Sequence, residues 1–264
     1  MDPALRYPGA KWSLASWIIE HLPPHVSYLE PFFGSGAVFF NKPKSTVETI
    51  NDVDGSIVNL FKIIREKPHD LARLIKFTPW SREEYYASYK TTGDPLEDAR
   101  LFMVRCWQAF GTRTNNRTGW RCDIQGRLGT SMPSQWEKVP GRIIELADRL
   151  KEAQIENQPA VKIIERYKFP DVLIYADPPY LLSTRSGKMY ANEMTDDDHL
   201  ELLEVLDNHP GPVLLSGYHH PMYDDRLKHW ERCTQKSHAE KGAIREEVLW
   251  INQKAAVMTM PSLF

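Results

Sequence analysis

The chain has 264 residues, of which 42% are hydrophobic and 26% are charged. These proportions are typical of a globular protein and exclude a disordered chain, and a chain of this length buries an adequate core without disulfides or a structural metal. The formal charge is −2, from 33 basic and 35 acidic residues, which argues against a basic coat over the whole surface. Composition alone therefore names no function.

The cysteines and the absence of apolar runs bear on the compartment. Cys106, Cys122 and Cys233 form no C-x-x-C pair, and their number is odd, which argues against a disulfide framework and against a zinc site. The first residues show no secretory pattern, and no apolar run reaches the roughly 18 residues of a membrane span. We expect a cytoplasmic protein that binds neither membrane nor metal.

The first 64 residues predict alternating helices and strands. Apolar residues recur at helical spacing over 11–22, where Pro23 ends the helix. The next predicted elements are a strand at 26–30, a helix beginning at 37–40, a strand at 47–50 and a helix at 57–64. Such alternation is typical of a parallel sheet with helices on both faces.

The block 62–140 interrupts this alternation. Ser81 and Glu84 predict the start of a tyrosine-rich helix, and Asp94-Pro95 predicts a second helix that runs toward Phe110. Residues 111–135 are polar and rich in Gly, Thr, Asn and Arg, which predicts a long functional loop. We therefore expect 62–140 to be an inserted domain.

Alternation resumes after the insert. The predicted elements are a helix at 142–151, a strand at 154–157, a helix at 161–167, a strand at 171–176, a helix from Thr195 to Leu206 and a strand at 212–216. We expect 248–252 and 256–260 to form a closing antiparallel hairpin. The core of the fold would then comprise 1–61 and 141–264.

Two motifs in the first half are placed like parts of a nucleotide site. The run LEPFFGSG at 29–36 joins the first strand to a helix, where glycines let a ligand approach the backbone and the helix N-terminus favours anionic groups. Asp52 ends the next strand, a position from which a carboxylate can accept ribose hydroxyls. Each has an ordinary alternative, a tight turn for the first and a helix N-cap for the acid, although Asp54 suits the cap better.

The tetrapeptide Asp177-Pro178-Pro179-Tyr180 is more specific. Two prolines after a buried strand stiffen the backbone and remove two donors, which leaves carbonyls, one carboxylate and an aromatic face. These groups suit a planar ligand with an amino donor, such as N6 of adenine. We therefore assign the catalytic role to Asp177, Pro178, Pro179 and Tyr180, in preference to a strand that is merely terminated by prolines.

Charge is distributed unevenly along the chain. Between 101 and 136, five arginines stand against one acid, for a net +4. A charge run usually marks a solvated face, but Arg, Asn and Gln can read base edges and Arg can hold phosphates, so a basic segment in an acidic chain favours nucleic acid. The residues 177–207 carry eight acids against Arg185 and Lys188, which predicts an acidic outer face. The expected DNA-contacting residues are Arg113, Asn115, Asn116, Arg117, Arg121 and Arg127.

Together these motifs resemble the Dam-type family of DNA adenine-N6 methyltransferases. The resemblance rests on Tyr7-Pro8-Gly9-Ala10-Lys11, on the run at 29–36, on Asn51-Asp52 and on the tetrapeptide at 177–180, in that order. The segments 213–218 and 247–252 resemble later strands of the family. The match covers nearly the whole chain, and the tetrapeptide alone would be shared with other amino-methyltransferases.

The resemblance implies an α/β fold, a Rossmann-like class I methyltransferase sheet with a mainly helical target-recognition insert. The catalytic core would be 1–61 and 141–264, and the DNA-binding domain 62–140. The implied cofactor is S-adenosylmethionine and the implied partner is double-stranded DNA. The implied cofactor-binding residues are Tyr7, Gly9, Lys11, Pro31, Phe32, Gly34, Ser35, Gly36, Asp52 and Asp177. Many relatives carry an acid near Pro159, by the expected position of the cofactor adenine, and this chain departs from them there.

Other functions fit parts of the pattern. An RNA adenine methyltransferase would use the same chemistry, whereas a protein-glutamine methyltransferase prefers Asn at the position of Asp177. A DNA-binding protein with an inactive methyltransferase core is disfavoured by the intact tetrapeptide and glycine turn. A nicotinamide-dependent oxidoreductase would need the full G-x-G-x-x-G pattern, which this sequence lacks.

Overall fold

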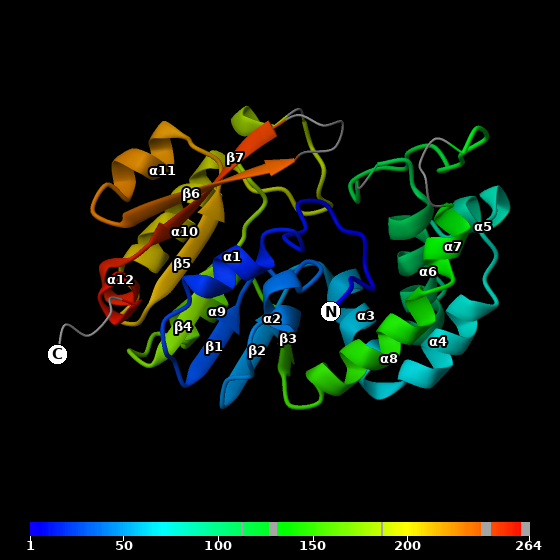
Figure 1. Cartoon of the computed structure of the whole chain (residues 1–264), viewed down its shortest axis with the longest axis horizontal. Coiled ribbons are helices and arrows are strands. Elements are labelled where there is room, and N and C mark those ends of the chain that lie inside the picture. Colours follow the sequence, from blue (N-terminus) through cyan, green and yellow to red (C-terminus); the bar gives the residue numbers. More distant parts are fainter. Residues whose placement is uncertain (112, 127–130, 186, 239–243, 260–264) are drawn as a thin grey trace.

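A seven-stranded sheet runs through the molecule, with a lobe of helices beside it (Figure 1). The structure is a computed structural model and describes residues 1–111, 113–126, 131–185, 187–238 and 244–259. The strand order is β3-β2-β1-β4-β5-β7-β6. The strands are β1 (Ser27–Glu30), β2 (Val47–Asn51), β3 (Gln154–Glu156), β4 (Val172–Ala176), β5 (Val213–Gly217), β6 (Glu231–His238) and β7 (Ile244–Ile251).

The first five strands are parallel, and β7 is antiparallel to both β5 and β6. This mixed sheet confirms the expected Rossmann-like class I methyltransferase architecture. Helices cover both of its faces. One face packs on α1 (Ala15–Glu20), α2 (Ala37–Asn41) and α12 (Gln253–Thr259), and the other on α9 (Ala160–Arg166), α10 (Asp196–Asp207) and α11 (Pro221–Arg226).

Alternate side chains of each central strand enter opposite cores. On β4, Leu173 and Tyr175 pack with the first group of helices, whereas Ile174 and Ala176 pack with the second. Every residue of β4 and of β5 is buried. Strands buried on both faces are continuous apolar runs in the sequence, which is why 171–176 and 212–216 are recognisable as strands.

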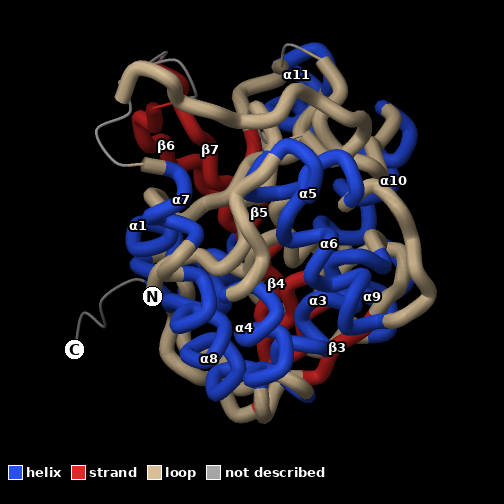
Figure 2. The backbone as a smooth tube through the Cα atoms, turned by 90° about the vertical axis from the view of Figure 1, so that its right-hand side faces the viewer, coloured by secondary structure: helices blue, strands red, loops and turns tan. Residues whose placement is uncertain are grey.

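The helical lobe comprises α3 (Gly55–Glu66), α4 (Pro68–Lys76), α5 (Arg82–Ala87), α6 (Pro95–Gln108), α7 (Met132–Trp136) and α8 (Val139–Leu150). Helix α3 packs against α6 and α8, and α4 packs against α8; Figure 2 shows these helices in front of the strands. The expected boundaries at 61/62 and 140/141 fall inside α3 and α8, so these two helices connect the lobe to the sheet. Asp54 caps α3 by accepting a hydrogen bond from the Ser56 N–H, as expected.

The expected hairpin of 248–252 with 256–260 is wrong. Strand β7 pairs instead with β6, residues 253–259 form α12, and residue 260 lies outside the described residues. The side chain of Asn252 ends the strand: its Oδ1 accepts hydrogen bonds from the N–H groups of Val213 (3.1 Å) and Ala255 (2.9 Å). Because a side-chain acceptor at this position starts a helix, the strand pattern does not continue beyond it.

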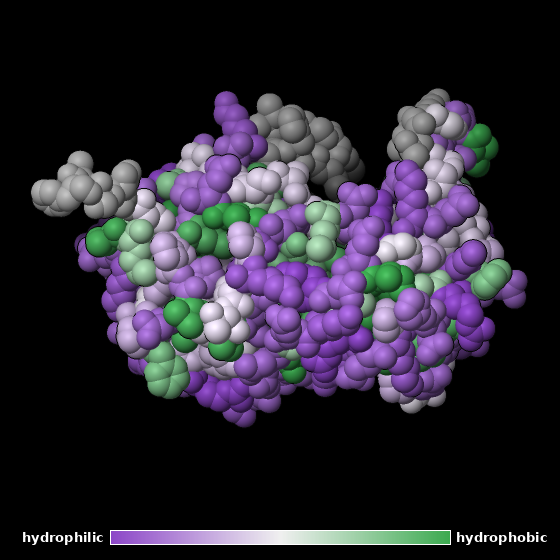
Figure 3. Space-filling view, turned by 60° about the horizontal axis from the view of Figure 1, so that its bottom comes forward, coloured by the Kyte–Doolittle hydropathy of each residue, from purple (hydrophilic) through white to green (hydrophobic). Residues whose placement is uncertain are grey.

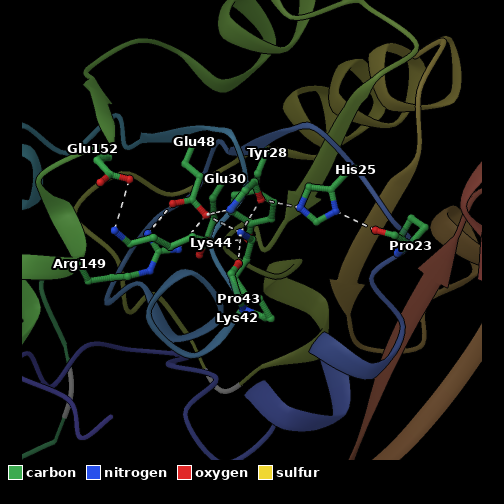
Figure 4. A network of polar contacts seen from close by, with 11 residues as sticks. Pro23, His25, Tyr28, Glu30, Lys42, Pro43, Lys44, Glu48, Arg149 and Glu152 are labelled. Carbon is green, nitrogen blue, oxygen red and sulfur yellow. Dashed lines mark hydrogen bonds and ion pairs between the residues drawn. The ribbon is translucent and has the colours of Figure 1, made fainter.

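A buried charge network joins β2 to α8 at the opposite end of β2 from Asn51. Glu48 is 3% exposed and accepts hydrogen bonds from Lys42 and from both terminal nitrogens of Arg149 (Figure 4). These two cations and the N–H of Ser45 lower the pKa of Glu48, although its burial opposes the shift. The network fixes α8, and with it the lobe, against the sheet.

The surface seen in Figure 3 is mostly hydrophilic, with apolar residues in scattered patches. Single exposed apolar side chains are normal on soluble domains. Among the helices of the described residues, none has the length and apolar composition that crossing a bilayer requires.

Candidate active site

A cavity of about 780 Å³ opens at the carboxyl ends of the parallel strands. Its walls come from the segments that follow β1, β2, β3 and β4, together with residues 7–11 and 190–194. From β1 the sheet extends to β2 and β3 on one side and to β4 and β5 on the other. Ligands of open α/β sheets bind at such a switch point, outside the carboxyl ends of the strands, so the topology itself locates the site.

The cavity brings most of the predicted cofactor-binding residues together. Its lining includes Tyr7, Gly9, Lys11, Pro31, Phe32, Gly34, Ser35, Asp52 and Asp177. Gly36 has a different position, at the N-cap of α2 with a φ of 68°. A Cβ there would lie 2.4 Å from Phe33 Cζ and 2.6 Å from Phe40 Cε2. Gly36 therefore makes room for the phenylalanine core beneath the turn.

The glycine turn and the acid after β2 are bonded to each other. Asp52 Oδ2 accepts a hydrogen bond from the Gly34 N–H at 2.9 Å, and its Oδ1 accepts one from the Asp54 N–H at 2.9 Å. Burial raises the pKa of Asp52 to about 7, although these two N–H groups oppose the rise. Gly34 has a φ of 51°, and its missing Cβ would lie 3.3 Å from the Tyr7 ring. Tyr7, Gly34 and Asp52 thus form one cradle on this side of the cavity.

The cavity wall also includes residues outside the sequence motifs. Tyr190 packs its ring 6.0 Å from that of Tyr7, and its hydroxyl donates a hydrogen bond to the Pro8 carbonyl at 3.3 Å. A Cβ on Gly9 would lie 2.3 Å from this hydroxyl, so Gly9 is needed for the contact. The expected acidic outer face lines the cavity in part, through Glu193, Asp198 and Glu201. In the sequence, an aromatic residue at 190 within this acidic stretch was the feature that could have indicated a site residue.

A buried charge cluster lies beside the tetrapeptide. Lys11 Nζ is 3.0 Å from Asp177 Oδ1 and 3.4 Å from Glu247 Oε1, and it donates a hydrogen bond to the Gly9 carbonyl at 2.7 Å. Burial raises the pKa of Asp177; Lys11 opposes this rise and the negative charge of Glu247 adds to it. Asp177 Oδ1 is buried and is paired with Lys11, while the Asp177 side chain keeps 18% of its surface exposed and lines the cavity. The carboxylate therefore has lone pairs left that a ligand's donor can use.

The rest of the tetrapeptide supports this acceptor. Pro179 lines the cavity, Pro178 is buried and Tyr180 is half-buried. The Tyr180 hydroxyl donates a hydrogen bond to Glu247, its ring contacts Tyr218 edge to face with centroids 4.6 Å apart, and Lys11 Nζ lies 4.6 Å from its centroid. Glu247 was not among the predicted site residues. An acid directly before the apolar run at 248–251 was the available signal.

The predicted DNA-contacting residues fall into two groups. Exposed side chains on the loop between α6 and α7 are Arg113, Asn115, Asn116 and Arg117. Arg121 faces its own domain instead, with Nε donating a hydrogen bond to the Ala109 carbonyl at 3.1 Å. Arg127 lies outside the described residues. The structure thus groups four of the six on one exposed loop.

Comparisons with known proteins identify the family of the chain. The family model described as "D12 class N6 adenine-specific DNA methyltransferase" matches residues 7–240. The DNA adenine methylase of Salmonella typhi is 26% identical over 233 residues, which cover 81% of this chain and 80% of the relative. The DNA adenine methylase of Vibrio cholerae serotype O1 (strain O395) is 26% identical over 213 residues, 76% of this chain and 74% of the relative. The DNA N-6-adenine-methyltransferase of Escherichia phage P1 is 30% identical over 122 residues, 43% of this chain and 16% of that protein.

Proposed function

The chain belongs to the D12 class N6 adenine-specific DNA methyltransferase family and is a DNA adenine-N6 methyltransferase, and from this premise we propose how its residues perform the reaction. The methyl donor is S-adenosylmethionine, and the acceptor is an adenine that has left the DNA duplex. One observation carries the proposal. The Asp177 carboxylate lines the cavity with 18% of its side chain exposed, and Lys11 Nζ holds it at 3.0 Å.

The cavity fits this cofactor. Its volume of about 780 Å³ lies within the roughly 300–1,000 Å³ of typical ligand sites. Asp52, at the end of β2, offers a half-buried carboxylate to the ribose hydroxyls, and the acidic lining complements a cationic sulfonium ligand. The residues that we propose to hold the cofactor are Tyr7, Gly9, Lys11, Pro31, Phe32, Gly34, Ser35, Asp52 and Asp177, with Gly36 supporting the turn.

When bound, the cofactor supplies a methyl group on a sulfonium. The Asp177 carboxylate and the Pro178 carbonyl accept the two N6–H groups, which orients the N6 lone pair, and the Tyr180 ring stacks on the base. This lone pair would receive the methyl group of the cofactor, and Asp177 would accept the proton that N6 releases and pass it to water. Positioning and preorganised acceptors supply the rate.

The lobe supplies the DNA contacts in this proposal. An adenine stacked in a duplex is out of reach, so it must be flipped out, at a cost of about a few kcal/mol. The exposed loop of Arg113, Asn115, Asn116 and Arg117 carries the charge and the amide groups that bind phosphates and base edges. We therefore propose 62–140 as the target-recognition domain, anchored by α3 and α8.

Transfer of a tritiated methyl group tests the function. We expect label at adenine N6 of duplex DNA and none on RNA of matched sequence. Asp177→Ala should abolish transfer while the fold persists. Asp171→Ala, an exposed acid just before β4, is the matched control and should retain activity. Label on RNA alone, or an active Asp177→Ala enzyme, would contradict the proposal, and methylome sequencing of a naive host would identify the recognition sequence.

A further inference from the structure

Glu247 is a buried acid to which the mechanism above gives no role. It is 3% exposed on β7, 3.4 Å from Lys11 Nζ, and it accepts a hydrogen bond from the Tyr180 hydroxyl. A buried carboxylate costs free energy even when it is paired. Its position beside Lys11 and Tyr180 therefore indicates a role in the proposed site.

We propose that Glu247 is a positioning residue that shares Lys11 with Asp177, and so keeps the surroundings of the Asp177 acceptor negative. Through its hydrogen bond it also holds the Tyr180 ring beside that acceptor. The inference rests on the proposed function, because it assigns Glu247 a part in the same methyl transfer.

The charges of Lys11, Asp177 and Glu247 explain how Glu247 would affect methyl transfer. One ammonium faces two carboxylates, at 3.0 Å from Asp177 and 3.4 Å from Glu247, so the three groups together carry one negative charge when both acids are ionised. Methyl transfer moves positive charge from the donor sulfur to N6, next to Asp177. A negative cluster stabilises that charge as it develops. With a neutral residue at 247, Lys11 would neutralise Asp177 and the cluster would lose this effect.

The fold holds Glu247 in this position. Val248, the next residue of β7, is fully buried and pairs with Gly217 of β5, while Glu246 on the other side is exposed. A shift of one residue would place Glu246 or Val248 in the position of Glu247. The register of β7 therefore places the acid beside Lys11, which arrives from the opposite end of the chain.

Glu247→Gln tests the charge, since glutamine keeps an acceptor for the Tyr180 hydroxyl. We expect the single-turnover rate at saturating DNA and cofactor to fall roughly 10- to 100-fold, with cofactor affinity changed by less than about twofold. Removing a like charge lowers the pKa of Asp177. Because transfer needs the ionised carboxylate, the acidic limb of the rate profile should move to lower pH.

The pH comparison must consider every titratable group that faces Asp177. They are Lys11, Glu30 on β1, Tyr175 on β4, Tyr180 and Tyr190 after β4, Tyr223 on α11 and Glu247 on β7. Glu247→Gln changes one of these and leaves the others in place. Glu246→Gln makes the same substitution at the exposed neighbour on the same strand and should leave the rate and the limb unchanged.

Two further variants separate charge from anchoring. Tyr180→Phe removes the hydrogen bond but keeps the Glu247 charge, so it should not move the limb to lower pH. Glu247→Asp keeps the charge and should recover part of the rate lost in Glu247→Gln. If near-ultraviolet circular dichroism shows that Glu247→Gln does not fold, the rate of Glu247→Asp relative to the wild type tests the role of Glu247 instead.

The outcomes distinguish this inference from the proposed function. A wild-type enzyme that transfers no methyl group to duplex DNA overturns the proposed function. Three results with an active wild type overturn the role of Glu247 alone. The first is an unchanged rate in Glu247→Gln, and the second is a slower rate whose acidic limb stays at the same pH. The third is a well-folded Glu247→Asp that is no faster than Glu247→Gln.

Discussion

Thr114, on the loop between α6 and α7, donates two hydrogen bonds to the carbonyl oxygen of Met189, from its N–H at 2.8 Å and from its hydroxyl at 3.3 Å. The Ala191 N–H in turn donates a hydrogen bond to the Thr114 hydroxyl at 3.0 Å. Residues 190–194 line the cavity. This clasp therefore joins the loop proposed to contact DNA to the wall proposed to contact the cofactor.

Thr114→Val should weaken cofactor binding. Valine keeps the shape and the backbone bond but removes the hydroxyl that holds Ala191. A hydrogen bond contributes about 1 kcal/mol net, so we expect the cofactor Kd to rise about fivefold. Isothermal titration calorimetry measures this, with Thr91→Val, at an exposed threonine of the lobe, as the control. Equal affinities for the two variants would show that the clasp does not support the cavity wall.

Arg113→Ala should weaken binding to duplex DNA and reduce its salt dependence. The side chain is exposed on the loop between α6 and α7, and removing one phosphate-binding cation reduces the slope of log K against log salt by about 0.9 for B-DNA. Fluorescence anisotropy across a salt series measures the slope. Lys151→Ala removes an exposed cation at the end of α8 and should leave the slope unchanged. A slope unaffected by Arg113→Ala would argue against a phosphate contact at that position.

Glu48→Gln should destabilise the fold without altering the cavity. It leaves Lys42 and Arg149 buried without their counter-charge, and breaking such a buried pair costs about 3–5 kcal/mol of unfolding free energy. Glu152→Gln breaks the exposed pair with Lys44, at 3.3 Å, and should cost less than about 1 kcal/mol. Urea unfolding compares the two. Similar losses would mean that the buried network adds little to stability.

The core of the site was predictable because it depends on local patterns and one topological rule. The turn with Gly34 and the acid Asp52 each follow a recognisable strand, and parallel strands bring their carboxyl ends to one edge. The same rule brings Asp177 to this edge from 125 positions further along the sequence. Strand ends could therefore be joined into one cavity without knowledge of side-chain packing.

The last part of the sheet was not predictable in this way. Strand β6 is an edge strand whose described side chains are mostly exposed, so it lacks the apolar alternation that marks a half-buried strand. The contact of Glu247 with Lys11 joins residues 236 positions apart, and no spacing rule relates them. The sequence marks Glu247 as an acid before an apolar run, but its contact with Lys11 depends on the tertiary packing of β7 beside β5.

Glu30 gives the wild-type protein a pH-dependent stability that Glu30→Gln should reduce. The side chain is 2% exposed at the end of β1 and accepts a hydrogen bond from the Tyr28 hydroxyl at 2.7 Å. Burial raises the pKa of Glu30 to about 8, from an ordinary value of 4.5. Between these values the folded state keeps a proton that the unfolded state has lost. Stability from this group is therefore present at low pH and is lost as pH rises, by up to about 1.4 kcal/mol per pH unit.

Urea unfolding of both proteins at several pH values between 5.5 and 7.5 measures this difference. Glutamine keeps an acceptor for the Tyr28 hydroxyl and does not titrate, so its free energy of unfolding should fall less steeply with pH than that of the wild type. Asp52, whose pKa burial raises to about 7, acts in the same direction in both proteins and cancels in the comparison. Glu20→Gln, at an exposed acid of α1, should follow the wild-type curve. Parallel curves for wild type and Glu30→Gln would mean that folded Glu30 is already ionised across this range.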